Sequence, residues 1–225
     1  MNIYTFKIKS YSFLEKLIGK RLLKKYEILI YTQFTSNLGI HFFHIPKSGG
    51  TSISQLLYGR RIGHNSYEDV FRIKGERYFD KLIIFSVVRD PLQRLISSYR
   101  FALTGGELGD AKMKDKYNRD ERFSNFDRFV NEWLVHQNLN EIDILFRPQY
   151  KFICDNNDKI VTENVFKIEN IKKIENFLEE VLNENIDIPH LNKTGGGNEN
   201  LNIANSTKKT VIKLYQHDYK LFNYL

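Results

Sequence analysis

Residues 81–88 form an almost uninterrupted apolar run that ends abruptly at Arg89-Asp90-Pro91. A strand that is apolar at nearly every position, rather than at alternate positions, is buried on both faces, as strands of parallel sheets are. Pro91 suits the first turn of a helix, and the apolar residues after it recur at helical spacing. The run therefore predicts a buried parallel strand that is followed by a turn and a helix.

A second unit of the same kind lies earlier in the chain. Residues 39–45 are a short aromatic-rich segment, which is typical of a strand, and residues 46–52 lead from it into a helical pattern that starts near Ile53. Two strand–turn–helix units predict an α/β fold. We expect a central, mainly parallel sheet flanked by helices in three layers, similar to the fold of P-loop proteins.

Other patterns complete this fold. A third strand is expected at residues 165–168. Apolar residues at helical spacing predict further helices over residues 125–137, 170–184 and 207–222. Residues 104–122 and 192–206 are rich in glycine, asparagine or charge and lack an apolar repeat, so loops are expected there.

The N-terminal region carries a basic amphipathic pattern. Residues 11–25 place leucine, isoleucine and tyrosine at helical spacing, with lysine and arginine largely between them. Such a helix can lie on an anionic membrane, but it more commonly packs its apolar stripe on its own domain. We therefore expect residues 1–36 to be an extension packed on a domain of residues 37–225, with a peripheral membrane contact through residues 11–25 as the alternative.

Composition and charge narrow the class of protein. Lysine and arginine exceed aspartate and glutamate by 34 − 27 = 7, which favours anionic partners such as nucleotides, acidic polysaccharides, nucleic acids or membrane headgroups. The single cysteine, Cys154, excludes an internal disulfide framework and a multi-cysteine zinc site. No apolar run approaches the ~20 residues that span a bilayer, and lysines interrupt the apolar stretches near the N-terminus. We expect a cytoplasmic protein without a signal peptide or a transmembrane helix.

The turn at residues 46–52 predicts an anion site. Gly49 and Gly50 allow the backbone to approach a ligand, and the amides that follow open a helix whose positive end favours an anion. Lys47 adds a full positive charge. The hydroxyls that can donate to phosphate oxygens are those of Ser48, Thr51 and Ser52. The lysine precedes the glycines, unlike in the Walker pattern, and no acidic residue follows a buried strand in the place of a magnesium ligand.

At this point the chain resembles a known family. Residues 44–52 (His-Ile-Pro-Lys-Ser-Gly-Gly-Thr-Ser) resemble the 5′-phosphosulfate loop of carbohydrate sulfotransferases, and residues 88–99 resemble their 3′-phosphate motif. The resemblance extends more weakly over residues 149–170 and 189–194, so it covers residues 40 to about 220. It implies that 3′-phosphoadenosine 5′-phosphosulfate is the donor and that a sugar hydroxyl is the acceptor. This chemistry needs no metal.

The resemblance also implies roles for particular residues. Arg89 is expected to bind the 3′-phosphate of the donor through its forked guanidinium, and Ser97 to add a hydroxyl two helical turns further on. Lys47 is expected to neutralise the charge that builds on the leaving phosphate. Lys193 and Thr194 lie in a glycine-rich segment similar to the late loop that covers the nucleotide in related enzymes, so we expect them to contact the donor.

The acceptor hydroxyl needs a base that titrates near neutrality, and His64 occupies the place of the family's catalytic base. Gly63 before it suggests an exposed turn. His44 is the alternative base, and Glu68 and Asp69 are alternatives that would act as base or orient His64.

Other polar residues near the motifs are expected to be structural. Asp90 and Arg94 are expected to hold the loop and helix rather than the ligand, Gln149 to pack, and His41 to be a core histidine. His190, next to the late loop, is a candidate contact to donor or acceptor.

The sequence therefore predicts a sulfotransferase that modifies a carbohydrate, with an acidic polysaccharide compatible with the positive charge. Family members in eukaryotes often sit behind a membrane anchor, and the lack of one here suggests either a bacterial cytoplasmic enzyme or a shortened chain. Two alternatives remain: a kinase-like phosphotransferase that uses ATP and magnesium, and a basic nucleic-acid-binding module. The aromatic residues fall mostly at core-like positions, so no nucleic acid is expected.

Overall fold

The computed structural model describes residues 3–106, 111–189 and 201–225, with side chains described from residue 19 onward and residues 111 and 112 excepted. The strands are β1 (Ile40–Phe43), β2 (Ile83–Val88) and β3 (Asn164–Lys167). The helices are α1 (Ile3–Leu38), α2 (Gly50–Tyr58), α3 (Tyr67–Lys74), α4 (Pro91–Leu103), α5 (Ala111–Asn118), α6 (Phe126–Arg128), α7 (Tyr150–Ile153), α8 (Ile171–Leu182), α9 (Asn205–Leu214) and α10 (Gln216–Leu221).

The described strands form a parallel sheet in the order β1-β2-β3. Phe43 at the end of β1 pairs with Ser86, and Val88 at the end of β2 pairs with Lys167. Ser86 Oγ also donates a hydrogen bond of 2.7 Å to the Phe43 carbonyl, which ties β1 to β2 beyond the backbone ladder. The register brings the carboxyl ends of the strands, where ligands of open α/β sheets bind, to one edge.

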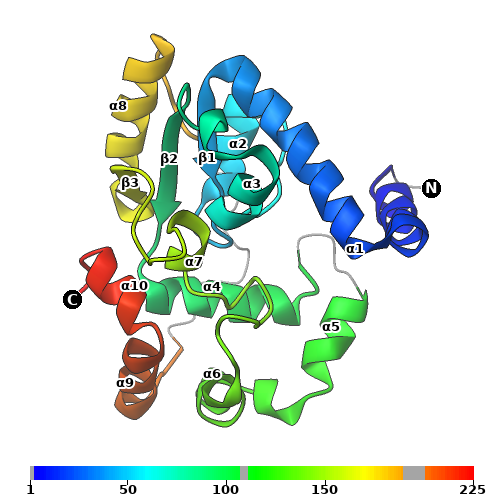
Figure 1. The fold of residues 1–225 in the computed structure, drawn as a ribbon. Coiled ribbons are helices and arrows are strands. Elements are labelled where there is room, and N and C mark those ends of the chain that lie inside the picture. The colour runs from blue at the N-terminus through cyan, green and yellow to red at the C-terminus, as the bar shows by residue number, and fades with distance from the viewer. Residues whose placement is uncertain (1–2, 107–110, 190–200) are drawn as a thin grey trace.

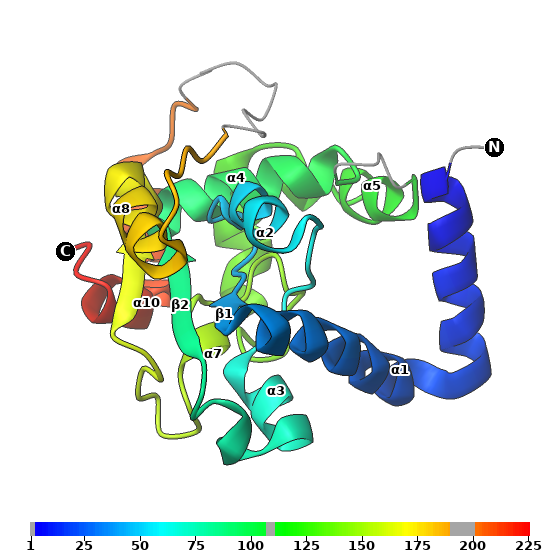
Figure 2. The same ribbon diagram turned by 90° about the horizontal axis from the view of Figure 1, so that it is seen from above.

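Helices cover both faces of the sheet, which confirms the predicted α/β fold (Figures 1 and 2). On one face, Ile53 of α2 and Leu178 of α8 pack on Phe42 and Phe85, and these residues are fully buried. The other face lies against α3, α7 and α10. Side chains buried there include Phe43, Val70, Val88, Phe152, Ile153 and Phe222.

A third apolar cluster lies in the helical region next to the carboxyl ends of the strands. It joins α4 and α9 to the segment between residues 117 and 146, and Figure 1 shows these elements below the sheet. Its fully buried members include Leu95, Ala102, Phe129, Phe146 and Val211. This cluster fixes α4, and with it the turn that begins the helix after β2.

Helix α1 runs beside β1 and bends at Gly19, whose φ of 79° and ψ of 154° are not helical. Figure 2 shows that the part before Gly19 runs in a different direction from the part after it. The part after it packs on the domain through Leu23, Ile28 and Tyr31, all buried, and the Tyr31 hydroxyl donates to the Phe42 carbonyl at 2.5 Å. Within the described residues, none of the helices is both long and apolar enough to span a membrane.

Three local predictions differ from the structure, and some helices were not predicted. Part of the loop expected over residues 104–122 is helix α5, because Tyr117 is buried and donates a hydrogen bond to Asp143. The helix expected over residues 207–222 breaks at Tyr215, whose hydroxyl reaches the Phe146 carbonyl at 2.6 Å. The helix expected over residues 125–137 is not a regular α-helix. It starts with α6, continues as a π-helical turn at Phe129–Trp133 and ends as a 3-10 turn at Leu134–His136. Helix α3 was not predicted.

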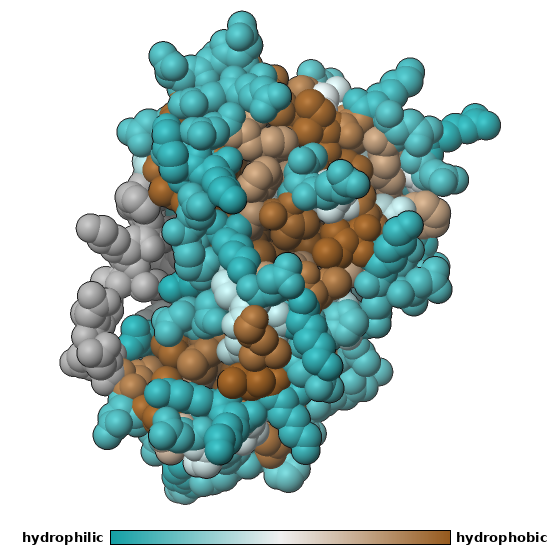
Figure 3. Space-filling view, turned by 90° about the vertical axis from the view of Figure 1, so that its left-hand side faces the viewer, coloured by the Kyte–Doolittle hydropathy of each residue, from teal (hydrophilic) through white to brown (hydrophobic). Residues whose placement is uncertain are grey.

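The side of the molecule formed by α8 and β3 faces the viewer in Figure 3, where hydrophobic residues gather between hydrophilic ones. A shallow hollow of about 470 Å³ on this side of the protein is lined by Ile160, Val161 and Val165 among others. It lies away from the carboxyl ends of β1 and β2.

Candidate active site

The turn after β1 has the backbone shape of an anion site. Lys47 and Gly49 both adopt left-handed conformations, with φ of 66° and 82°, and Gly49 directly precedes the first turn of α2. The Ser48 side chain does not face the cavity described below. It is fully buried, and its Oγ donates to the Ile45 carbonyl at 2.8 Å, which closes the turn on itself.

Both glycines of the turn are required by close packing. A Cβ atom on Gly50 would overlap the ring of His44 and would lie 2.9 Å from Cζ of Phe42. A Cβ on Gly49 would lie 2.6 Å from Cδ1 of Ile168, in addition to its left-handed backbone. The glycine pair therefore lets the start of α2 lie directly against the sheet.

Arg89 is held by a hydrogen-bond clamp that crosses the domain. The side chain of Gln149 accepts from the Arg89 amide at 2.9 Å and donates to the Arg89 carbonyl at 2.8 Å. The buried carboxylate of Asp218 in α10 accepts from the amides of Gln149 and Tyr150 at 2.8 and 2.9 Å. Gln149 is fully buried, so its expected packing role is the one observed. The clamp fixes the backbone from which the Arg89 guanidinium extends.

Arg94, in the second motif, contacts the turn of the first motif and is almost completely buried. Its guanidinium donates to the carbonyls of Pro46, Leu145 and Arg147, at 2.9, 3.4 and 2.8 Å. Asp90 accepts from the amide of Gln93 and caps α4. Both residues therefore hold loop and helix, as the sequence predicts.

A cavity of about 130 Å³ lies where these elements meet. Lys47 and Arg89 supply two cations to its wall, and Thr51 and Ser97 supply two hydroxyls. The Lys47 ammonium stands 4.0 Å from the ring centre of Phe101, and an Arg89 nitrogen lies 3.5 Å from the Lys47 carbonyl. The cavity wall consists of His44, Pro46, Lys47, Gly49, Gly50, Thr51, His64, Arg89, Ser97, Phe101 and Leu145.

The cations of this cavity are destabilised by their surroundings. Burial, together with the charge of Arg89, lowers the pKa of Lys47 to about 8. Burial also lowers the pKa of Arg89, and Glu169 and Asp90 partly offset this effect. Two neighbouring cations that are partly removed from water gain when an anion enters between them. The cavity therefore favours an anionic ligand.

His64 lies at the same cavity and is half-buried, and Gly63 before it is exposed, as the sequence suggests. Its Nδ1 is 2.8 Å from the carbonyl oxygen of His44. Because a carbonyl only accepts, Nδ1 carries the proton and Nε2 holds a lone pair in the neutral ring. Burial, together with the charges of Lys24, Arg94 and Lys47, lowers the pKa of His64 to about 4, and the bond to His44 opposes this shift.

Of the other candidate bases, His44 lines the same cavity, whereas Glu68 and Asp69 do not. His44 is buried, its ring centre lies 4.3 Å from that of His64, and burial holds its pKa well below the usual value. Asp69 forms a capping box with Ser66 at the start of α3, and Glu68 accepts a hydrogen bond from Asn156.

Some expected donor contacts are not assembled at the cavity. Ser52 is buried in α2 and does not line it. Lys193, Thr194 and His190 lie outside the described residues. Phe101 and Leu145 line the cavity but were not predicted, because they are apolar residues outside both motifs. In the part of the chain that is described, no group of three or more His, Cys, Asp or Glu side chains is placed to hold a metal ion.

Comparison with known proteins identifies the family. A family model described as the sulfotransferase family matches residues 32–225, which include both motifs and all three strands. No curated protein and no solved structure matches the chain. The matched region contains every residue that lines the cavity. The chain belongs to the sulfotransferase family, whose reaction is the transfer of a sulfuryl group.

Proposed function

We propose that this protein transfers the sulfuryl group of 3′-phosphoadenosine 5′-phosphosulfate to a hydroxyl of a carbohydrate. The observation that carries the proposal is the single cavity where Lys47, Arg89 and His64 meet the glycine turn at the start of α2. Family membership supports sulfuryl transfer, and the pair of cations supports a donor with two separate anionic groups.

The two cations suit the two ends of such a donor. The turn residues and the amides at the start of α2 would bind the 5′-phosphosulfate, because a helix N-terminus stabilises negative charge. Arg89, with Ser97 beside it, would bind the 3′-phosphate through a forked, charge-assisted contact. The Gln149 clamp supports this role by fixing the Arg89 backbone before the donor arrives.

Sulfuryl transfer is an in-line displacement that depends on positioning and charge stabilisation. The acceptor oxygen forms a bond to sulfur while the bond between sulfur and the bridging phosphate oxygen breaks. The electron pair of that bond leaves with the phosphate, whose added negative charge Lys47 would stabilise. The proton of the acceptor hydroxyl passes to a base.

We assign the base to Nε2 of His64, the nitrogen that holds a lone pair while Nδ1 donates to His44. Burial lowers the pKa of this ring in the free protein, and three cations lower it to a smaller extent. A multiply charged anion in the cavity would offset them and raise the pKa of His64 toward neutrality, where a general base is most effective. The donor itself would therefore prepare the base.

Calorimetric titration without magnesium tests the donor. We expect adenosine 3′,5′-bisphosphate to bind at least tenfold more tightly than 5′-AMP or ATP, and Arg89→Ala to remove most of that preference. Equal binding of the three nucleotides, or ATP binding that requires magnesium, would refute the donor assignment and favour the kinase-like alternative.

A transfer assay tests the base. With radiolabelled donor and a mixture of polysaccharides, His64→Gln should reduce turnover roughly 100-fold or more while leaving the affinity for the bisphosphate unchanged. Glu68→Gln is the matched control, because Glu68 bonds to Asn156 rather than lining the cavity. Unchanged turnover in His64→Gln would refute the assignment.

A further inference from the structure

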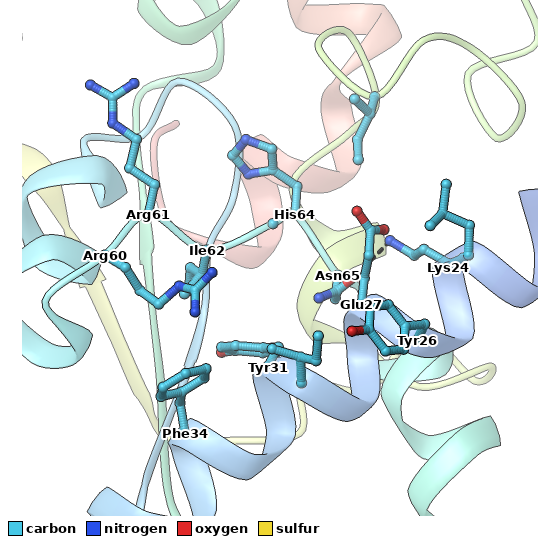
Figure 4. A pocket seen from close by; sticks show the side chains of 14 residues that line it. Lys24, Tyr26, Glu27, Tyr31, Phe34, Arg60, Arg61, Ile62, His64 and Asn65 are labelled. Carbon is cyan, nitrogen blue, oxygen red and sulfur yellow. Dashed lines mark hydrogen bonds between the residues drawn. The ribbon is translucent and has the colours of Figure 1, made fainter. Parts of the chain in front are cut away.

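A second, larger cavity lies on the other side of His64. It is a groove of about 410 Å³ between α1 and residues 60–65 (Figure 4), a volume in the range of small-ligand sites. His64 lines both this groove and the smaller donor cavity. A molecule in the groove therefore contacts the same histidine as a donor in the smaller cavity.

Most of the groove wall on one side comes from α1. Leu23, Tyr26, Tyr31 and Phe34 give it aromatic and aliphatic surface, and Tyr26 is 57% exposed. Most of these α1 residues precede residue 32, where the match to the sulfotransferase family begins. The groove is therefore built partly from a segment outside the region that matches the family.

The polar groups of the groove are mainly cationic. Lys24, Arg60 and Arg61 line it together with one carboxylate among the described residues, that of Glu27. Lys24 donates to Asn65 at 2.6 Å, a contact drawn in Figure 4. The groove thus combines flat aromatic surface with an excess of positive charge.

Among the cations that line the groove, Arg60 is the one whose N–H groups are available to a ligand. It is exposed, and its guanidinium carbon lies 4.9 Å from the ring centre of Phe34. Within the described residues, no hydrogen bond or ion pair occupies its nitrogens. A guanidinium that is oriented by an aromatic ring and keeps its donors available is suited to a carboxylate or a sulfate.

We propose that this groove binds the sulfate acceptor and that the acceptor is an acidic saccharide; the inference rests on the function proposed above. The apolar face of a sugar ring would stack on Tyr26, while an acidic group of the saccharide pairs with Arg60. A hydroxyl of the same saccharide then reaches His64 at the boundary between groove and donor cavity. Helix α1 thereby determines which acceptor is used.

Binding of defined oligosaccharides to the full chain, saturated with adenosine 3′,5′-bisphosphate, tests the inference. The probes are tetrasaccharides of hyaluronan, unsulfated chondroitin and heparosan, with neutral chitotetraose as the uncharged counterpart. We expect at least one acidic tetrasaccharide to bind and chitotetraose to bind at least tenfold more weakly. Arg60→Ala and Tyr26→Ala should each weaken binding of the acidic probe by roughly tenfold or more.

Arg72→Ala is the matched control, because Arg72 is an exposed arginine of α3 outside the groove. It should leave the saccharide affinity unchanged, and all three variants should keep the bisphosphate affinity of the unmodified protein. The inference is overturned if no acidic tetrasaccharide binds while the bisphosphate does, or if Arg60→Ala and Tyr26→Ala behave like Arg72→Ala. Absence of selective bisphosphate binding in the unmodified protein would instead refute the proposed function, and the inference with it.

Discussion

His41 gives this protein a predictable sensitivity to acid. The ring is completely buried among aromatic side chains, its Nδ1 lies 2.9 Å from the Tyr78 hydroxyl, and its Nε2 has no partner among the described residues. Burial lowers the pKa of His41 from 6.5 to about 3. Tyr31 and Tyr78, the titratable groups whose rings face it, are uncharged at acidic pH.

Because the pKa of His41 differs between the folded and the unfolded protein, the free energy of unfolding depends on pH. Below pH 6.5 the unfolded chain binds a proton at His41, while the folded protein does not do so until about pH 3. The free energy of unfolding therefore falls as the pH drops through this window. Between pH 7 and pH 4.5 the two pKa values correspond to a loss of about 2.5 kcal/mol from His41 alone.

Urea unfolding of the unmodified protein and of His41→Phe, each at pH 7 and pH 4.5, measures this contribution. Phenylalanine suits the aromatic surroundings, and Tyr78 keeps its hydrogen bond to Thr35 in the variant. We expect the loss of stability between the two pH values to be about 2.5 kcal/mol smaller in His41→Phe. Equal losses in the two proteins would show that His41 is not a buried neutral histidine.

Three further outcomes follow from the donor site. Above pH 8, where Lys47 loses its proton in the free protein, affinity for the bisphosphate should fall by up to roughly tenfold per pH unit; a constant calorimetric affinity from pH 7 to 9.5 would contradict this. Gly50→Ala should lower stability by about 1–3 kcal/mol in thermal melts because its Cβ overlaps His44. Gly63→Ala is the control and should not lower stability, because the nearest atom to its added Cβ lies at 3.9 Å. Equal melting temperatures of the two variants would refute the packing argument. Asp218→Asn should cost about 1.5–3 kcal/mol and also weaken bisphosphate binding, since it loosens the clamp; a change in stability alone would show that the clamp does not reach the donor.

The parts of the fold that could be predicted are those that depend on short, contiguous sequence patterns. Each strand–turn–helix unit contains its apolar strand, its turn residues and its helix start within about twenty residues. Parallel pairing then brings Lys47 and Arg89 together without further information. Helix α3 was missed although Ser66 and Asp69 form its capping box, because its 8 residues are too few to show a helical repeat.

The parts that could not be predicted depend on contacts between distant segments. Gln149 and Arg89 are 60 residues apart in the sequence, and no local sequence pattern at either residue predicts their hydrogen bond. Residues 26–38 of α1 were also missed, because polar residues interrupt the apolar repeat there. The hydroxyls of Thr32 and Thr35 donate hydrogen bonds to carbonyls of the helix itself, so burying them costs little free energy.

The clamp on Arg89 also links the donor site to local opening of α10. Asp218 of this short helix accepts from the backbone amides of Gln149 and Tyr150, so local unfolding of α10 frees Gln149, and with it Arg89, without breaking the strand pairing. We therefore expect the amides of Gln149 and Tyr150 to exchange their hydrogens more slowly when adenosine 3′,5′-bisphosphate is bound.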